Sequence, residues 1–126
     1  MPSRLTGLVA EDEGLLRLEL VEELSAAGWQ VKEAATGEEA LRLLSRTEAC
    51  GEKIDFLITD IRLGGAVDGW QLAEAFRKAW PGMPVIYVSA NLIAENRQAA
   101  GSIFLSKPVD VESLIASCRL LIAARG

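Results

Sequence analysis

Residues 54–60 read IDFLITD, a short and mostly apolar run that ends in an aspartate. A run of this length, bounded by polar loops, is typical of a strand that is buried on both faces of a sheet. Similar runs recur along the chain, at residues 5–10, 29–34, 84–89 and 102–105. The sequence therefore predicts five short strands, and the stretches between them decide how these strands are connected.

Helical patterns separate the predicted strands. Apolar residues at helical spacing predict helices at residues 15–27, 36–49, 70–80, 91–100 and 110–123. The second of these opens with Thr36 followed by Glu39, which is the pattern of a capping box. Strands that alternate with helices predict a doubly wound α/β fold with a parallel sheet. We expect residues 1–126 to form a single domain of this class.

Composition narrows the classes of function. The 126 residues are 50% hydrophobic and 25% charged, which is the balance of a globular domain. With 13 basic and 18 acidic residues the net charge is -5, so binding to nucleic acid or to a membrane surface is disfavoured. The absence of histidine excludes an imidazole base, a histidine-ligated metal and a phosphohistidine on this chain.

The expected location is the cytoplasm. The two cysteines, Cys50 and Cys118, are far apart in the sequence and fit a reducing compartment better than a disulfide scaffold. The chain begins without a secretory signal pattern, and no apolar run reaches the length of a membrane span.

The residues that end the predicted strands carry the chemistry. In a doubly wound sheet, ligands bind at the carboxyl ends of the strands. The chain places there Glu11, Asp12 and Glu13 after the first strand, Asp60 after the third, Ser89 at the end of the fourth, and Lys107 after the fifth. Clustered carboxylates repel one another, and a hard divalent cation such as Mg²⁺ relieves that repulsion.

An aspartate beside Mg²⁺ and a lysine is suited to accept a phosphoryl group. Aspartate is a known nucleophile in aspartyl-phosphate chemistry, and the metal and the ammonium neutralise the oxygens of the group in transfer. The sequence contains neither a GxxxxGK[ST] loop nor a GxGxxG loop, so a nucleotide-binding interpretation lacks a phosphate cradle.

Four motifs together resemble one known family. They are the acidic pair at residues 11–12, DFLITDIRLGG at 55–65 with DGW at 68–70, PVIYVSA at 84–90, and FLSKP at 104–108. As a set they resemble the receiver domain of two-component response regulators, over essentially the whole chain. This resemblance implies a flavodoxin-like parallel sheet of strand order 2-1-3-4-5 with five helices.

The resemblance also implies roles for individual residues. Asp60 matches the phosphoacceptor and Lys107 the family's lysine, with a cis bond to Pro108. The metal, Mg²⁺ or Mn²⁺, would be held by Asp12, by Asp60, by the backbone carbonyl of Arg62, and by Glu11 through a water. Ser89 matches the switch hydroxyl residue and Phe104 the switch aromatic.

The same resemblance implies partners. A histidine kinase or a histidine phosphotransfer protein would phosphorylate Asp60, and the domain would catalyse that transfer and its own dephosphorylation without being a dedicated enzyme. The signal would pass to a downstream protein through the face formed by the fourth helix, the fifth strand and the fifth helix. We expect a stand-alone receiver, because the sequence starts at Met1 and ends just after the predicted fifth helix, and a domain cut from a longer chain stays open as the alternative. The expected assembly is a monomer or a weak homodimer.

The chain departs from the family pattern in five places. The spacing from Ser89 to Phe104 is shorter by about one helical turn, and the segment before the third strand is longer than usual. The first acid is Glu11, where aspartate is commoner. The loop IRLGGAVDG at residues 61–69 lacks the usual proline, is one residue longer, and contains two adjacent glycines. The switch aromatic, Phe104, has no hydroxyl.

Two alternatives stay open. The first is a small phosphatase of the haloacid-dehalogenase type with Asp60 as its nucleophile. Those enzymes carry a second acid two residues after the nucleophile, and Arg62 stands there in this chain. The second is a receiver-like interaction module that is never phosphorylated, against which the acid cluster and Lys107 speak.

Overall fold

The computed structural model describes residues 4–90 and 98–124. Five parallel strands form its sheet: β1 (Thr6–Ala10), β2 (Gln30–Ala34), β3 (Phe56–Asp60), β4 (Val85–Ser89) and β5 (Ile103–Ser106). Their order is β2-β1-β3-β4-β5. The predicted flavodoxin-like sheet is therefore confirmed, each strand within one or two residues of its expected bounds.

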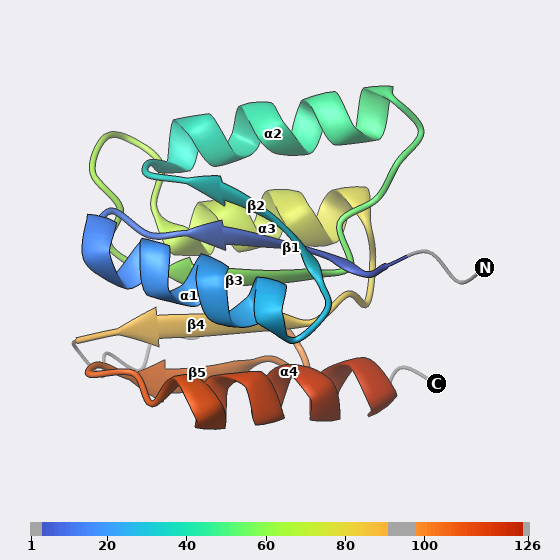
Figure 1. Ribbon diagram of the computed structural model, residues 1–126. Coiled ribbons are helices and arrows are strands. Elements are labelled where there is room, and N and C mark those ends of the chain that lie inside the picture. The colour runs from blue at the N-terminus through green and yellow to red at the C-terminus, as the bar shows by residue number, and fades with distance from the viewer. Residues whose placement is uncertain (1–3, 91–97, 125–126) are drawn as a thin grey trace.

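Helices cover both faces of the sheet (Figure 1). They are α1 (Gly14–Ala26), α2 (Gly37–Ala49), α3 (Gly69–Ala79) and α4 (Val111–Ala124). One hydrophobic cluster joins the sheet to α2 and α3, and a second joins its other face to α1 and α4. The sheet is thus wound on both sides, as the alternation of elements predicts.

The helix count differs from the prediction. The described residues contain four helices where the sequence predicts five. The helix predicted over 91–100 falls mainly on residues 91–97, which lie outside the described residues, and the described residues 98–100 are not helical. The helix labelled α4 is therefore the one that the sequence predicts as the fifth.

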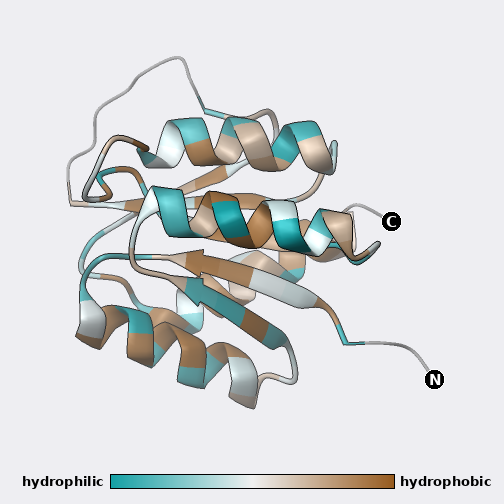
Figure 2. Cartoon of the chain, turned by 90° about the horizontal axis from the view of Figure 1, so that it is seen from above, coloured by the Kyte–Doolittle hydropathy of each residue, from teal (hydrophilic) through white to brown (hydrophobic). Residues whose placement is uncertain are grey.

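The central strands are the most deeply buried part of the fold. Every residue of β3 and β4 is buried, whereas the edge strands β2 and β5 are partly exposed. This matches the sequence, because the central runs are almost continuously apolar and the edge strand β2 contains Gln30, Lys32 and Glu33. The helices carry hydrophobic and hydrophilic residues side by side (Figure 2), as expected of helices that bury one face.

The parallel register determines which residues at the ends of neighbouring strands lie side by side. Ala10 pairs with Thr59 and Asp60 pairs with Val88, so Glu11, the residue after Ala10, lies level with Asp60. The chain therefore brings the acids that follow β1 and the acid that ends β3 to one edge of the sheet.

Side-chain caps fix the starts of two helices near that edge. The Thr36 hydroxyl accepts the Glu39 backbone N–H at 3.1 Å, as predicted, but the Glu39 carboxylate accepts from the Ala35 N–H instead of completing the box at Thr36. A full capping box that sequence reasoning overlooked, formed by Asp68 and Gln71, begins α3. Both helices thus start at positions set by local hydrogen bonds.

Within residues 4–90 and 98–124, none of the helices combines the length and the apolar character that crossing a membrane requires.

Candidate functional site

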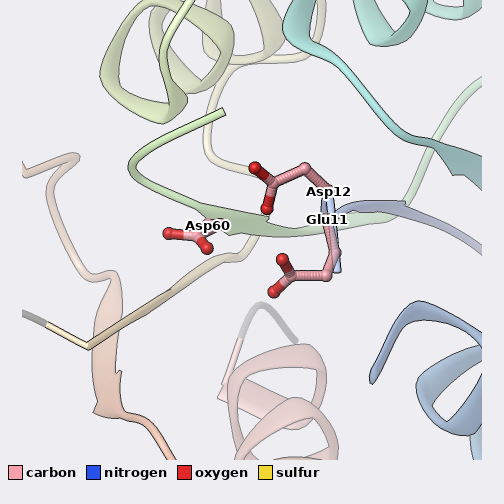
Figure 3. Close-up of side chains that lie close together, drawn as sticks. All are labelled: Glu11, Asp12 and Asp60. Atoms are coloured by element: carbon pink, nitrogen blue, oxygen red, sulfur yellow. The ribbon is translucent and has the colours of Figure 1, made fainter. Parts of the chain in front are cut away.

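Three carboxylates meet at the carboxyl edge of the sheet (Figure 3). Glu11 and Asp12 directly follow β1, and Asp60 is the last residue of β3. Each offers an oxygen that lies within 4.8 Å of the other two. Glu11 and Asp60 are buried, whereas Asp12 is exposed. The structure therefore brings together the acids that the sequence singles out.

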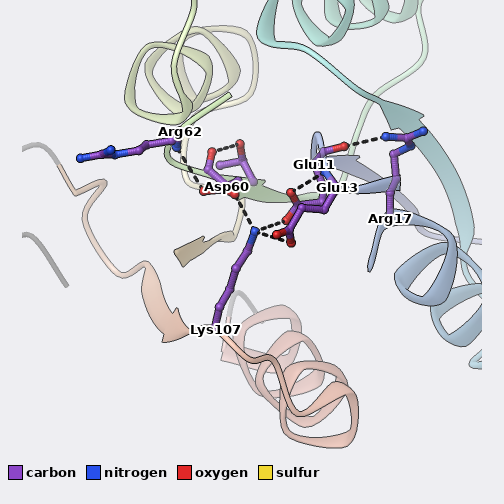
Figure 4. Close-up of polar contacts among 7 residues, drawn as sticks. Glu11, Glu13, Arg17, Asp60, Arg62 and Lys107 are labelled. Atoms are coloured by element: carbon purple, nitrogen blue, oxygen red, sulfur yellow. Dashed lines mark hydrogen bonds and ion pairs between the residues drawn. The ribbon is translucent and has the colours of Figure 1, made fainter. Parts of the chain in front are cut away.

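Lys107 supplies the positive charge at this cluster (Figure 4). Its Nζ lies 2.7 Å from Asp60 Oδ2, 2.9 Å from Glu11 Oε1 and 2.9 Å from Glu13 Oε2. Its peptide bond to Pro108 is cis, as the resemblance implies. The lysine thus bridges the ends of β1 and β3 from its position after β5.

Glu13 is a member of this cluster that sequence reasoning noted but gave no role. Its side chain is mostly exposed, in contrast to Glu11, and its backbone N–H donates to Glu11 Oε2 at 3.1 Å. The sequence feature that could have identified Glu13 is its place as the third acid of the run at residues 11–13. Its contact with Lys107 depends on the side-chain conformation and could not be read from spacing.

Burial and neighbouring charges shift the pKa values of Glu11 and Lys107, whose side chains contact each other. Burial raises the pKa of Glu11 to about 7, although the Glu13 N–H and Lys107 favour its ionised form. Burial disfavours the charged form of Lys107, but hydrogen bonds to Asp60, Glu13 and Glu11 outweigh it and hold the lysine pKa above its usual range. Lys107 is therefore a fixed cation.

The backbone after Asp60 is folded tightly around it. The Arg62 N–H donates to Asp60 Oδ1 at 3.1 Å, and the Gly69 N–H donates to the Ile61 carbonyl at 2.7 Å. A Cβ on Gly69 would clash with the backbone oxygen of Asp60, which explains why a glycine follows Asp68. The loop that contains Arg62 therefore returns to the acid cluster, while the role of the Arg62 carbonyl stays a prediction.

Ser89 and Phe104 lie on the β4–β5 side of the sheet, Ser89 at its carboxyl edge and Phe104 inside β5. Ser89 is buried at the end of β4, opposite Ser106 of β5, and its backbone carbonyl accepts the Lys107 N–H at 2.9 Å. Phe104 lies inside β5, half-buried, with its ring centroid 6.5 Å from that of Tyr87. The structure places both residues, and their switching roles stay predictions.

Tyr87 is a residue of this region that sequence reasoning missed. It is fully buried in β4, its ring lies 4.8 Å from that of Trp70, and its hydroxyl accepts the Ala99 N–H at 3.0 Å. A tyrosine inside a buried strand needs a partner for its hydroxyl, and that requirement was the signal available in PVIYVSA. Its ring joins the first turn of α3 to β5.

The donor set suits a hard divalent cation. Its side-chain ligands are carboxylate oxygens, one of them exposed and two buried, and they come from two adjacent strand ends. Mg²⁺ prefers oxygen ligands, is commonly held by one or two carboxylates and keeps several waters. The cluster therefore fits Mg²⁺ or Mn²⁺ better than a metal that needs nitrogen or sulfur ligands.

The sequence matches the family model of the response regulator receiver domain over residues 8–119. It is 41% identical over 112 residues to the transcriptional regulatory protein GlrR of Escherichia coli K12, covering 85% of this chain and 23% of that protein. It is 32% identical over 111 residues to the sensor histidine kinase RcsC of Salmonella typhi, covering 85% of this chain and 11% of that protein. The chain thus spans less than a quarter of the length of these relatives.

Solved structures agree with these matches. A response regulator receiver protein from Sinorhizobium medicae superposes with a TM-score of 0.90 at 34% identity, covering 98% of both chains. The receiver domain of the hybrid histidine kinase CckA superposes with a TM-score of 0.79 at 32% identity, covering 93% of this chain and 98% of that one.

Proposed function

The chain belongs to the response regulator receiver domain family of two-component signalling, and we propose that Asp60 is the residue that accepts the phosphoryl group. The observation that carries this proposal is the position of Lys107 Nζ, 2.7 Å from Asp60 Oδ2, beside the carboxylates of Glu11 and Asp12. Glu11 also contacts Lys107 and belongs to the candidate metal site, but Asp60 makes the shorter contact with the lysine and is the acid that matches the phosphoacceptor of the family motif.

The proposed donor is the phosphohistidine of a histidine kinase or of a histidine phosphotransfer protein. A carboxylate oxygen of Asp60 attacks phosphorus, a P–O bond forms, and the P–N bond to the donor imidazole breaks. The imidazole keeps the bonding electron pair and takes a proton from water. Hydrolysis of the acyl phosphate later returns Asp60 and inorganic phosphate, so the domain catalyses its own chemistry and is not a dedicated enzyme.

The chain's own residues bind and orient the group in transfer. Asp12, Asp60, the Arg62 carbonyl and, through water, Glu11 would hold Mg²⁺ or Mn²⁺, which when bound neutralises charge on the phosphoryl oxygens. Lys107 exchanges part of its contact with the carboxylates for a phosphoryl oxygen. Stabilisation of this kind requires positioned charge and little covalent assistance.

The proposed output passes through the β4–β5 side. The Ser89 hydroxyl donates to a phosphoryl oxygen, and the resulting shift of Ser89 allows Phe104 to reorient. The downstream protein would bind the face that contains β5, α4 and the residues before β5. We therefore expect a beryllofluoride adduct to change hydrogen exchange in residues 89–107, of which 91–97 lie outside the described residues, more than in α1 or α2.

The proposal extends to cell compartment and assembly. A phosphohistidine donor of this kind is cytoplasmic, and the two free cysteines, exposed Cys50 and buried Cys118, suit a reducing compartment. The proposed assembly is a monomer or a weak homodimer, which analytical ultracentrifugation with and without beryllofluoride would test.

Labelling with a small phosphodonor tests the proposed function. Acetyl phosphate with Mg²⁺ should add one phosphoryl group to the wild-type protein and none to Asp60→Asn, a nearly isosteric variant that should keep the fold, as circular dichroism can verify. Turnover of the donor without any accumulated label would favour the phosphatase alternative. Neither label nor turnover would favour the module that is never phosphorylated.

A metal titration tests the acid cluster separately. Asp12→Ala should weaken Mg²⁺ binding by about tenfold or more, because it removes a direct ligand. Glu22→Ala on α1 removes the same charge from an exposed position and serves as the matched control. Equal Mg²⁺ affinities for the two variants, measured by NMR titration, would contradict the assignment of Asp12.

A further inference from the structure

The loop after Asp60, residues 61–68, is anchored near its base by hydrogen bonds and by the buried side chain of Leu63. There the Arg62 N–H binds the Asp60 side chain, and Gly69 binds the Ile61 carbonyl. Its tip contains two adjacent glycines, Gly64 and Gly65, and Gly65 has a φ of +96°. Because glycine gives the backbone the widest conformational freedom, such a tip needs a contact of its own to hold one conformation.

The first turn of α2 provides that contact. Glu38, the second residue of α2, accepts the Ala66 N–H with Oε2 at 3.2 Å. Gly65 passes so close that a Cβ there would lie 2.6 Å from the same oxygen, and a Cβ on Gly37 would clash with the Val67 carbonyl. In Figure 1 this loop rises from the end of β3 beside the N-terminal end of α2. The tip is thus packed against the helix start.

Two further observations support a directed contact. The Thr36 cap fixes the first turn of α2, so the backbone that carries Glu38 is itself held in place. The Ala66 N–H, together with other backbone N–H groups, lowers the pKa of Glu38 below its usual value. The loop therefore meets an ionised carboxylate, which is a stronger acceptor than a neutral one.

We propose that Glu38 is a positioning residue that holds the loop after Asp60 so that the backbone of Arg62 stays at the acid cluster, and that it thereby sets the affinity for the divalent cation. This inference rests on the proposed function, which places the metal at that cluster. Without Glu38 the glycine-rich tip loses the hydrogen bond at Ala66 and becomes less ordered, so metal binding must order it at an entropic cost. The expected consequence is weaker binding, by about tenfold, with an unchanged set of ligands.

A purely structural role for Glu38 predicts something different. An acid in the first turn of a helix also stabilises that helix through the dipole, and its loss would then lower stability without affecting the metal. Glu39 offers the matched comparison, because it carries the same charge in the same turn and its carboxylate accepts the Ala35 N–H, away from the loop.

The experiment is an NMR Mg²⁺ titration of the unphosphorylated protein combined with hydrogen exchange at the Ala66 amide. Glu38→Ala should bind Mg²⁺ about tenfold more weakly and exchange faster at Ala66. Glu38→Gln, which keeps an acceptor oxygen, should stay close to wild type. Glu39→Ala should lose stability but keep both the affinity and the protection of Ala66.

If Glu38→Ala folds poorly, a variant in the loop after Asp60 can test the same contact. Gly65→Ala strains the tip and crowds the Glu38 carboxylate, so it should weaken Mg²⁺ binding as well. If the two act through one contact, Gly65→Ala should add little in the Glu38→Ala background.

The outcomes separate this inference from the proposed function. If the wild-type protein binds Mg²⁺ and Glu38→Ala binds it as tightly as Glu39→Ala, the positioning role is overturned while the proposed function stands. If the wild-type protein itself does not bind Mg²⁺, the metal assignment in the proposed function fails, and the role of Glu38 fails with it.

Discussion

Two neighbouring regions of the sheet, one at its carboxyl edge and one inside β4 and β5, are held together by different interactions. The acid–lysine centre, formed by Glu11, Asp60 and Lys107, is held by ionic contacts of 2.7 to 2.9 Å between residues at strand ends. The aromatic pair, Tyr87 and Phe104, is held by packing inside β4 and β5, with centroids 6.5 Å apart. The order of the strands suffices to assemble the first, whereas the second depends on side-chain conformation.

The difference also bears on function. In the acid–lysine centre, Asp60 and Lys107 match the family pattern, and Glu11 keeps a carboxylate where aspartate is commoner. In the aromatic pair, Phe104 lacks the hydroxyl that a tyrosine would bring, and a hydroxyl lies instead on Tyr87, bound to Ala99 just before β5. The acid–lysine centre thus resembles that of the family, whereas the aromatic pair, which we propose to carry the signal, differs from the family pattern.

Loss of Lys107 should have the largest effect on the acid–lysine centre. Lys107→Ala leaves Glu11 and Asp60 buried without a cation, so the free energy of unfolding without metal should fall by about 3 kcal/mol. Mg²⁺ should restore much of this, because it supplies the missing charge. Urea denaturation with and without Mg²⁺ measures both effects.

Lys78→Ala, at an exposed position on α3, is the control for that variant. It removes the same charge and should change stability by less than about 0.5 kcal/mol. Equal stabilities for the two variants in the absence of metal would show that the acid–lysine centre contributes no more than a surface charge.

A pH dependence should follow from Glu11. Its pKa rises from 4.5 to about 7 on folding, so between those values the folded state binds more protons than the unfolded state. Stability without metal should therefore fall as the pH rises from about 4.5 to 7, by on the order of 2–3 kcal/mol. Glu11→Gln should remove this component. A stability difference between wild type and Glu11→Gln that does not change with pH would contradict the raised pKa.

The smallest effect is expected at the aromatic pair. Tyr87→Phe keeps the ring against Trp70 but removes the acceptor for the Ala99 N–H, at a cost of about 1 kcal/mol. Amide exchange at Ala99 should become faster, and the acid–lysine centre should keep its Mg²⁺ affinity. Unchanged exchange at Ala99 would mean that the tyrosine hydroxyl does not hold the segment before β5.

Most of the fold could be predicted from the sequence because local patterns determine it. Apolar runs that end in polar residues predicted the positions of all five strands. Their alternation with helices predicted a sheet with helices on both faces. The predicted acids and Lys107 lie together because parallel register aligns the strand ends. Those inferences require the order of the elements but no knowledge of side-chain conformation.

The rest of the site was beyond sequence reasoning for a physical reason. The contacts of Glu13 with Lys107, of Tyr87 with Ala99 and of Glu38 with Ala66 join residues from different elements. Each depends on the conformation of one side chain over several rotatable bonds, and neither periodicity nor spacing specifies it. Such contacts distinguish this chain within a shared fold.

Chemical mapping of the phosphoryl group shows whether Asp60 is the phosphoacceptor. After treatment with acetyl phosphate and Mg²⁺, borohydride reduction converts a phosphorylated aspartate into homoserine, which peptide mass spectrometry locates. We expect homoserine at position 60 and no modification in the Asp60→Asn protein. Reduction product at Glu11, Asp12 or any other acid, with position 60 unmodified, would contradict the assignment of Asp60.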